Sequence, residues 1–132
     1  MYLLQPGSFP LKIETTKPSS RYGLKCQNAD QIALTKMDVL SSMKEIPVIT
    51  GYKRDGVIVT DFDPMDELDS YTSVVEMFPG WKCDISGCRT YEELPENAKA
   101  YIRILEQLLN HEIQFISVGA RRDQFLTKGA WL

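Results

Sequence analysis

Residues 35–38, Thr-Lys-Met-Asp, have the side chains in this sequence whose types and spacing best suit a defined chemistry. The ionised carboxylate of Asp38 can accept two parallel hydrogen bonds from a rigid pair of donors. Guanine offers such a pair in its N1–H and its exocyclic amine, and adenine has no equivalent. Lys36 can lay its aliphatic stem along the flat base while its charge stays in water. The spacing therefore predicts a guanine-binding loop, although a solvated turn is the commoner meaning of Lys-x-Asp after a strand.

A second candidate loop, Ser117-Val118-Gly119, follows the apolar run 113–116, just as the first loop follows the apolar run 32–34. Both runs have the length and composition of short buried strands. Open α/β sheets bind ligands at the carboxyl ends of strands. Glycine has no Cβ, so the backbone of this loop can approach a flat ring closely. We expect the second loop to contact the base edge opposite the carboxylate; a simple turn into the last segment is the alternative.

The elements that must position these loops are short strands and one helix. Further strands are expected at 46–52, 57–60 and 73–78, with an Asp-Gly hairpin turn between the first two. Pro47 has no N–H to donate, so its strand is expected to lie at an edge or a bulge there. The clearest element is a helix from about Pro95 to Leu109. Its apolar face comprises Leu94, Ala98, Tyr101, Ile102, Leu105, Leu108 and Leu109. We predict an α/β fold in which a mixed, few-stranded sheet packs on this long amphipathic helix, with the two loops at neighbouring strand ends.

The composition is that of one globular domain. The 132 residues are 43% hydrophobic and 25% charged, and the net charge of −3 predicts no attraction to nucleic acid or membranes. No apolar run approaches the roughly 20 residues of a membrane span, and the N-terminus lacks the features of a signal peptide, so a cytoplasmic location is expected. Residues 1–20, rich in proline, serine and threonine, are expected to be an extended or disordered lead-in to a domain at 21–132.

Metal chemistry finds little support in the sequence. With three cysteines and one histidine, a structural zinc site is not expected, and reduced thiols are favoured over a Cys83–Cys88 disulfide. The acidic segment Asp61–Asp69 fits no calcium-loop spacing and is expected to be a solvated loop or short helix. An enzyme that uses these carboxylates with a metal is the least supported alternative.

Several short segments, in consistent order over about residues 21–125, resemble the C-terminal portion of the adenylosuccinate synthetases. Each segment alone is common, but the combination is specific to that family. The matching segments are Arg21-Tyr22, Ile32-Ala33-Leu34-Thr35-Lys36-Met37-Asp38-Val39-Leu40, Phe78-Pro79-Gly80-Trp81, Asp84-Ile85-Ser86-Gly87, Leu94-Pro95-Glu96-Asn97-Ala98 with Tyr101-Ile102, and Ser117-Val118-Gly119.

The resemblance implies a place in purine nucleotide biosynthesis. Enzymes of that family join IMP to L-aspartate with GTP and magnesium, and they release adenylosuccinate, GDP and phosphate. The chain would then be a C-terminal fragment of a larger P-loop-NTPase-like α/β fold. The residues that the resemblance places around the guanine base are Lys36, Met37, Asp38, Ser117, Val118 and Gly119.

The sequence also departs from the family pattern. Ala120 stands where the family usually has proline, and no Gly-x-x-x-x-Gly-Lys-[Ser/Thr] phosphate loop occurs in these residues. Residues 1–20 do not match the arginine-rich substrate loop that normally precedes the Arg-Tyr pair. His111 follows a helix and is expected to be a surface residue, not the catalytic histidine of the family. No magnesium ligand or catalytic residue is therefore assigned.

We expect this chain to carry the guanine-recognition part and to be inactive alone, with IMP and L-aspartate bound only if the missing half is supplied. Base contacts without phosphate contacts predict nucleotide affinity of roughly millimolar order. The alternative is a non-catalytic, stand-alone interaction or nucleotide-binding module derived from the family. Strands cut from a larger sheet leave open edges, so a homodimer is one expected form.

Overall fold

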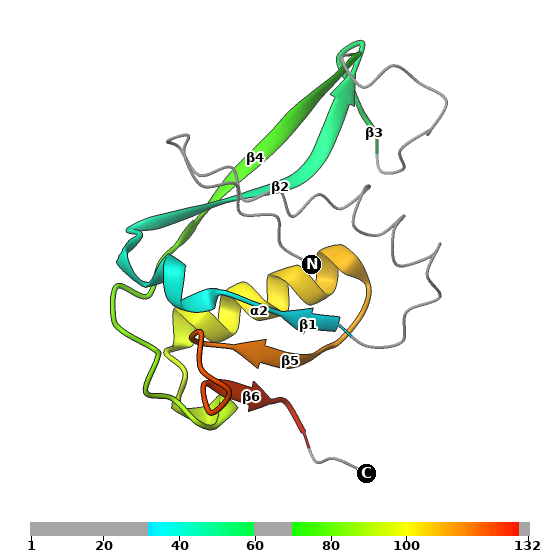
Figure 1. Ribbon diagram of the computed structural model, residues 1–132. Coiled ribbons are helices and arrows are strands. Elements are labelled where there is room, and N and C mark those ends of the chain that lie inside the picture. The colour runs from blue at the N-terminus through cyan, green and yellow to red at the C-terminus, as the bar shows by residue number, and fades with distance from the viewer. Residues whose placement is uncertain (1–31, 60–69, 130–132) are drawn as a thin grey trace.

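The computed structural model describes residues 32–59 and 70–129, which form two small sheets and one α-helix (Figure 1). The predicted lead-in at 1–20, the Arg21-Tyr22 match and the acidic segment 61–69 lie outside the described residues. The strands are β1 (Ile32–Leu34), β2 (Glu45–Arg54), β3 (Val57–Val59), β4 (Tyr71–Pro79), β5 (Ile113–Ser117) and β6 (Phe125–Thr127). The helices are the 3₁₀ turns η1 (Met37–Ser42) and η3 (Tyr91–Glu93) and the α-helix α2 (Glu96–Leu109).

The first sheet has the strand order β1-β5-β6 and contains the core of the molecule. β1 runs parallel to β5, and β6 returns antiparallel to β5. Figure 1 shows α2 lying across this sheet, as the crossover between parallel neighbours requires. The buried cluster joins Leu34 of β1 and Ile116 of β5 to Ile102 and Leu105 of the helix. The predicted packing of a helix on short strands is confirmed for this sheet.

The second sheet, β3-β2-β4, forms an antiparallel arm that extends away from α2 (Figure 1). We expected one sheet, and the division into two is a correction. β2 and β4 pair along their whole lengths, from Glu45–Pro79 to Arg54–Tyr71, so each satisfies one backbone edge of the other. This pairing joins segments on either side of a 16-residue interval, and no local pattern in the sequence specifies it.

The turn between β2 and β3 is the predicted Asp-Gly hairpin. Asp55 and Gly56 have φ angles of 51° and 79°, the left-handed values that a two-residue turn between twisted strands requires. β3 pairs only with residues 52–54 of β2. Pro47 therefore lies in a part of β2 that β3 does not reach, where a missing N–H removes no bond to β3. Among the described residues, this part of β2 is paired on one side only, with β4, which is consistent with the expected edge position.

Helix α2 begins and ends at residues with suitable backbone geometry. Pro95 is its N-cap, one residue outside the predicted first position, and Asn110 ends it in the left-handed conformation with φ 54°. The preceding turn η3 has the expected capping box, in which Thr90 and Glu93 exchange side-chain and backbone hydrogen bonds. The buried residues of α2 are Ala98, Tyr101, Ile102, Leu105 and Leu109.

The segment Gly80-Trp81 ties the arm, η1 and α2 together. The Trp81 indole N–H donates to the hydroxyl of Ser41 at 3.2 Å, and its ring lies 5.9 Å from that of Tyr101. The Asn97 side chain donates to the carbonyl of Gly80 at 2.9 Å. These contacts hold the 3₁₀ turn that carries Asp38 in a fixed position relative to the helix.

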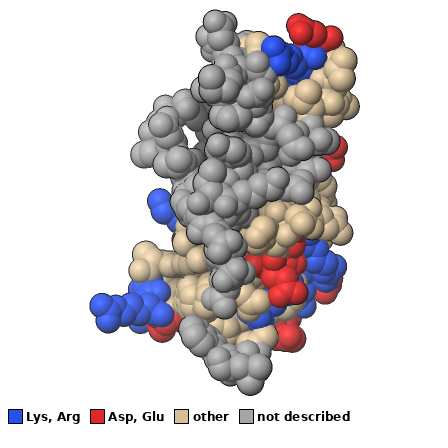
Figure 2. Space-filling model, turned by 90° about the vertical axis from the view of Figure 1, so that its right-hand side faces the viewer, with Lys and Arg blue, Asp and Glu red and all other residues tan. Residues whose placement is uncertain are grey.

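The surface of the described residues has no single sign of charge on the face shown in Figure 2. Lys and Arg lie interspersed with Asp and Glu there, rather than in one basic stripe that would suit a phosphate backbone. Among residues 32–59 and 70–129, no helix combines the length and the apolar character needed to span a membrane.

Candidate functional site

The two predicted loops follow the carboxyl ends of two neighbouring strands of the first sheet. Because β1 and β5 are parallel neighbours, with Leu34 opposite Ile116, the residues after each strand emerge at adjacent carboxyl ends. The turn η1, which follows β1, also packs against β5. The structure thus places residues 36–38 beside residues 117–119, at the strand ends where α/β sheets bind ligands.

The first loop presents one carboxylate and one ammonium group. Lys36 is exposed and takes the left-handed conformation, φ 60° and ψ 35°, where η1 begins. Asp38, in the first turn of η1, is half-buried. Among the described residues its carboxylate has no hydrogen bond or ion pair. A half-buried carboxylate of this kind is suited to accept hydrogen bonds from a ligand.

Met37 and Val118 play a different part from their neighbours in the loops. Met37 is 1% exposed and Val118 is fully buried, and both belong to the hydrophobic core. Their side chains anchor the loops and can touch no ligand. Only their backbone groups remain as candidates for base contacts. The sequence pattern did not reveal that these two side chains are buried.

The second loop is closed by its own hydrogen bonds. The N–H of Val118 donates to the carbonyl of Gln124 at 3.0 Å, and the Ser117 hydroxyl donates to the carbonyl of Gly119 at 2.9 Å. A Cβ on Gly119 would overlap the end of the Gln124 side chain, so glycine at this position lets that side chain lie directly against the backbone. The loop therefore offers a fixed backbone edge, rather than mobile side chains, to a ligand.

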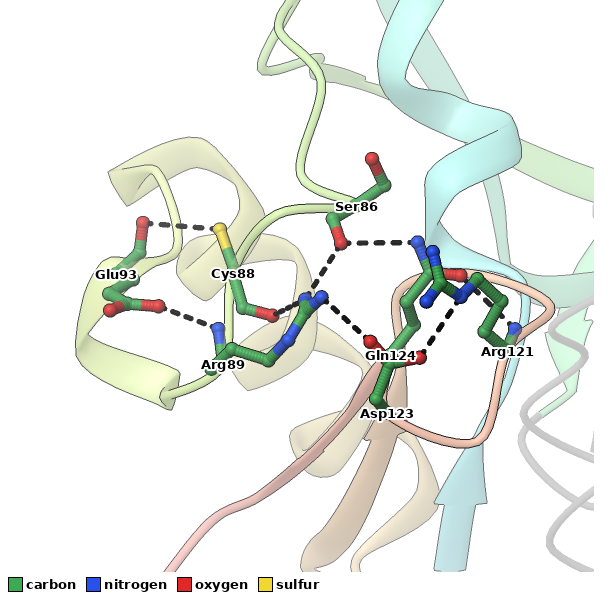
Figure 3. Close-up of polar contacts among 7 residues, drawn as sticks. All are labelled: Ser86, Cys88, Arg89, Glu93, Arg121, Asp123 and Gln124. Atoms are coloured by element: carbon green, nitrogen blue, oxygen red, sulfur yellow. Dashed lines mark hydrogen bonds and ion pairs between the residues drawn. The ribbon is translucent and has the colours of Figure 1, made fainter.

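A third segment, which sequence reasoning did not assign to the site, contacts this loop through Ser86 and Arg89 (Figure 3). The carbonyl of Ser86 accepts hydrogen bonds from Arg89 at 2.9 Å and from the Gln124 side chain at 3.3 Å. Arg89 also pairs with Asp123 at 3.2 Å. The Asp-Ile-Ser-Gly segment carries part of the family resemblance, but the sequence predicts no site role for it, and Gln124 belongs to none of the predicted motifs.

Backbone hydrogen bonds set the ionisation of the carboxylates near this support. The pKa of Asp84 is lowered by bonds from the backbone N–H and the hydroxyl of Ser86. Burial, and then the nearby Glu93 carboxylate, raise the pKa of the Cys88 thiol. Cys83 and Cys88 are both free thiols, in agreement with the expected reduced state. The third cysteine, Cys26, lies outside the described residues.

Glu93 gives a pH prediction. Its carboxylate accepts hydrogen bonds from the backbone N–H groups of Arg89 at 2.6 Å and Thr90 at 3.2 Å, which lower its pKa from the usual 4.5. A pKa lowered in the folded state adds stability above the unfolded pKa, and this contribution is lost as pH falls through the folded pKa. Glu93→Gln should therefore lose less stability than the parent on acidification below about pH 4.5. Urea unfolding midpoints across this range measure the effect, and Glu92→Gln is the control. An unchanged acid response in Glu93→Gln would contradict the prediction.

His111 does not lie at this end of the sheet. His111 precedes β5, so it lies at the opposite end of the sheet from the two loops, and its Nδ1 lies 3.1 Å from the carbonyl of Leu109. It is half-buried rather than fully on the surface. In the parts of the chain that the structure describes, no three His, Cys, Asp or Glu side chains form a group that could hold a metal ion. No magnesium ligand is assigned among the described residues.

Comparisons with known proteins agree on one family. The family model for adenylosuccinate synthetase matches residues 17–126. The adenylosuccinate synthetase of Trichlorobacter lovleyi is 45% identical over 105 residues, which cover 79% of this chain and 24% of that protein. The Plasmodium knowlesi protein of the same name is 43% identical over 111 residues, covering 80% and 25%.

A solved structure gives the same result. The fully ligated adenylosuccinate synthetase of Plasmodium falciparum superposes with a TM-score of 0.74 at 40% identity, over 80% of this chain and 26% of that chain. The chain spans about a quarter of the length of the relatives that it matches.

Proposed function

The chain belongs to the adenylosuccinate synthetase family, and from this premise we propose that it carries the guanine-binding part of such an enzyme. The observation that most supports the proposal is the position of Asp38. Its half-buried carboxylate follows β1 and lies beside the glycine loop that follows β5. This is the arrangement expected of a site in which a carboxylate binds one edge of a flat base and a backbone loop contacts the opposite side.

The proposed recognition rests on hydrogen-bond polarity. Asp38 accepts from the N1–H and the exocyclic amine of guanine, and a negatively charged acceptor makes both bonds stronger than a neutral one would. Adenine presents an unprotonated N1 at the corresponding position, so its lone pair faces the carboxylate and is repelled. Lys36 lies along the base through its aliphatic stem. The backbone of Ser117, Val118 and Gly119 meets the base on the other side.

For the whole reaction we propose the GTP-dependent ligation of IMP and L-aspartate, with this chain as one part of the enzyme. Phosphoryl transfer depends on groups that position the phosphates and stabilise their charge. We assign no such group here, since these 132 residues contain no Gly-x-x-x-x-Gly-Lys-[Ser/Thr] loop and the described residues form no group of three His, Cys, Asp or Glu side chains that could hold a metal ion. The proposal is that a larger P-loop-NTPase-like α/β fold supplies them, and that this chain alone does not catalyse the reaction.

The test is a titration of the folded chain with GDP and, separately, with ADP. We expect GDP to bind with a dissociation constant on the order of 1 mM, because base contacts act without phosphate contacts. ADP should bind at least about tenfold more weakly, since a charge-assisted bond contributes more than 1.4 kcal/mol. Amide chemical shifts followed by NMR suit this affinity range and report at the same time that the chain is folded. Equal binding of the two nucleotides to a folded sample would overturn the proposal.

A further inference from the structure

We propose that Gln124 and Arg89 are positioning residues for the guanine site, which they shape by fixing the backbone of the Ser117–Gly119 loop. This inference rests on the proposed function and adds to it the residues that make the loop selective. Neither side chain was expected to belong to the site. Neither needs to touch the nucleotide to act in this way.

Gln124 crosses the loop and closes it from both ends. Its backbone carbonyl accepts from the N–H of Val118 at 3.0 Å, and its backbone N–H donates to the carbonyl of Arg121 at 3.1 Å. Its side-chain oxygen accepts from the N–H of Arg121 at 3.1 Å. One residue thus makes three hydrogen bonds within the stretch 118–124, and these bonds fix the path of the chain on both sides of Gly119.

The fourth hydrogen bond of Gln124 reaches a distant part of the sequence. Its side-chain amide donates to the carbonyl of Ser86 at 3.3 Å, across 38 residues. Arg89 donates to the same carbonyl at 2.9 Å and to that of Cys88 at 2.9 Å, and its other terminal nitrogen pairs with Asp123. Ser86 and Asp123 are therefore both held by one guanidinium group (Figure 3). The loop rests on this support and is not free to move independently.

The space beside Gly119 explains why this support affects binding. The Gln124 side chain occupies the volume that a Cβ on Gly119 would fill, so it packs directly against the glycine backbone. A base would therefore meet the other side of this backbone, whose position the Gln124 side chain helps to fix. Removing the Gln124 side chain opens a gap next to this backbone and releases Arg121. The backbone of residues 117–119 then has several conformations in place of one. Binding must order it again, which costs conformational entropy and lowers affinity.

The experiment compares Gln124→Ala and the isosteric Gln124→Glu with the parent chain in the GDP and ADP titrations. Gln124→Glu keeps the acceptor for Arg121 but cannot donate to Ser86, and it provides a folded variant if the alanine protein is unstable. We expect GDP affinity to fall about fivefold to tenfold in Gln124→Ala and by a smaller factor in Gln124→Glu. ADP binding should change little, so the preference for GDP should shrink by the same factor.

The control is Gln114→Ala, which also truncates a glutamine and removes its side-chain hydrogen bond to Glu112, but at a position outside the loop. It should leave the GDP preference unchanged. If Gln124→Ala and Gln124→Glu both keep the parent's preference in folded samples, the positioning role is wrong while the guanine site stands. If the parent chain itself shows no preference, the guanine site and this inference both fail.

Discussion

Replacing Asp38 with asparagine is expected to remove the preference of the chain for GDP over ADP. Asparagine keeps the size of the side chain but carries no charge and places an NH₂ group where one carboxylate oxygen stood. One donor of the guanine edge then faces another donor, and the remaining bond loses its charge assistance. Hydrogen bonds to charged groups contribute about 1.5–3 kcal/mol, so GDP should bind at least about tenfold more weakly. ADP binding should be nearly unchanged.

The control for this substitution is Asp55→Asn in the β2–β3 turn. Asp55 is exposed, has φ 51°, and asparagine accepts this left-handed geometry readily. The variant makes the same change of charge away from the site and should bind GDP as the parent does. If Asp38→Asn bound GDP as tightly as Asp55→Asn, the carboxylate would have no role in base recognition.

The largest expected effect on stability comes from Gly80→Ala. Gly80 joins the end of β4 to the segment that packs on α2, and its N–H donates to the carbonyl of Lys44 at 2.9 Å. An added Cβ would overlap the carbonyl oxygen of Met43 and lie 3.2 Å from that of Lys44. These are backbone atoms, so the strands must separate to make room. Such rearrangements cost about 1–3 kcal/mol or more.

The matched substitution is Gly87→Ala, because a Cβ at this position would meet nothing within 4 Å. It should change the free energy of unfolding by no more than about 0.5 kcal/mol, as is usual for an exposed surface position. Urea unfolding of both variants measures the difference. Equal stabilities would contradict the close backbone approach between residues 43–44 and residue 80.

Local features were predictable from the sequence because short-range physics determines them. The helix at α2 follows from its apolar spacing and its proline start, and the β2–β3 turn follows from the Asp-Gly pair. The capping box of η3 also depends only on residues three apart. The adjacency of the two loops was predicted as well. It arises because β1 and β5 are parallel neighbours, although the antiparallel arm and α2 lie between them in the chain.

Other features depend on contacts that no local pattern contains. The pairing of β2 with β4 divides the strands into two sheets, and the short strand β6 exists because residues 125–127 return along β5. The burial of Met37 likewise follows from packing against the core. Gln124 contacts Ser86 across 38 residues, and Arg89 joins the same carbonyl. Spacing along the sequence alone could therefore assign neither side chain to the site.

The most direct test of the central claim is a double cycle that compares GDP and IDP on the parent chain and on Asp38→Asn. Hypoxanthine, the base of IDP, differs from guanine only in lacking the exocyclic amine, so the cycle isolates the contact between this amine and the carboxylate. We predict that GDP binds the parent chain at least about fivefold more tightly than IDP, and that the two bind Asp38→Asn equally. The same ratio of GDP to IDP affinity in both proteins would show that Asp38 does not contact the amine, and the guanine site would not be where we place it.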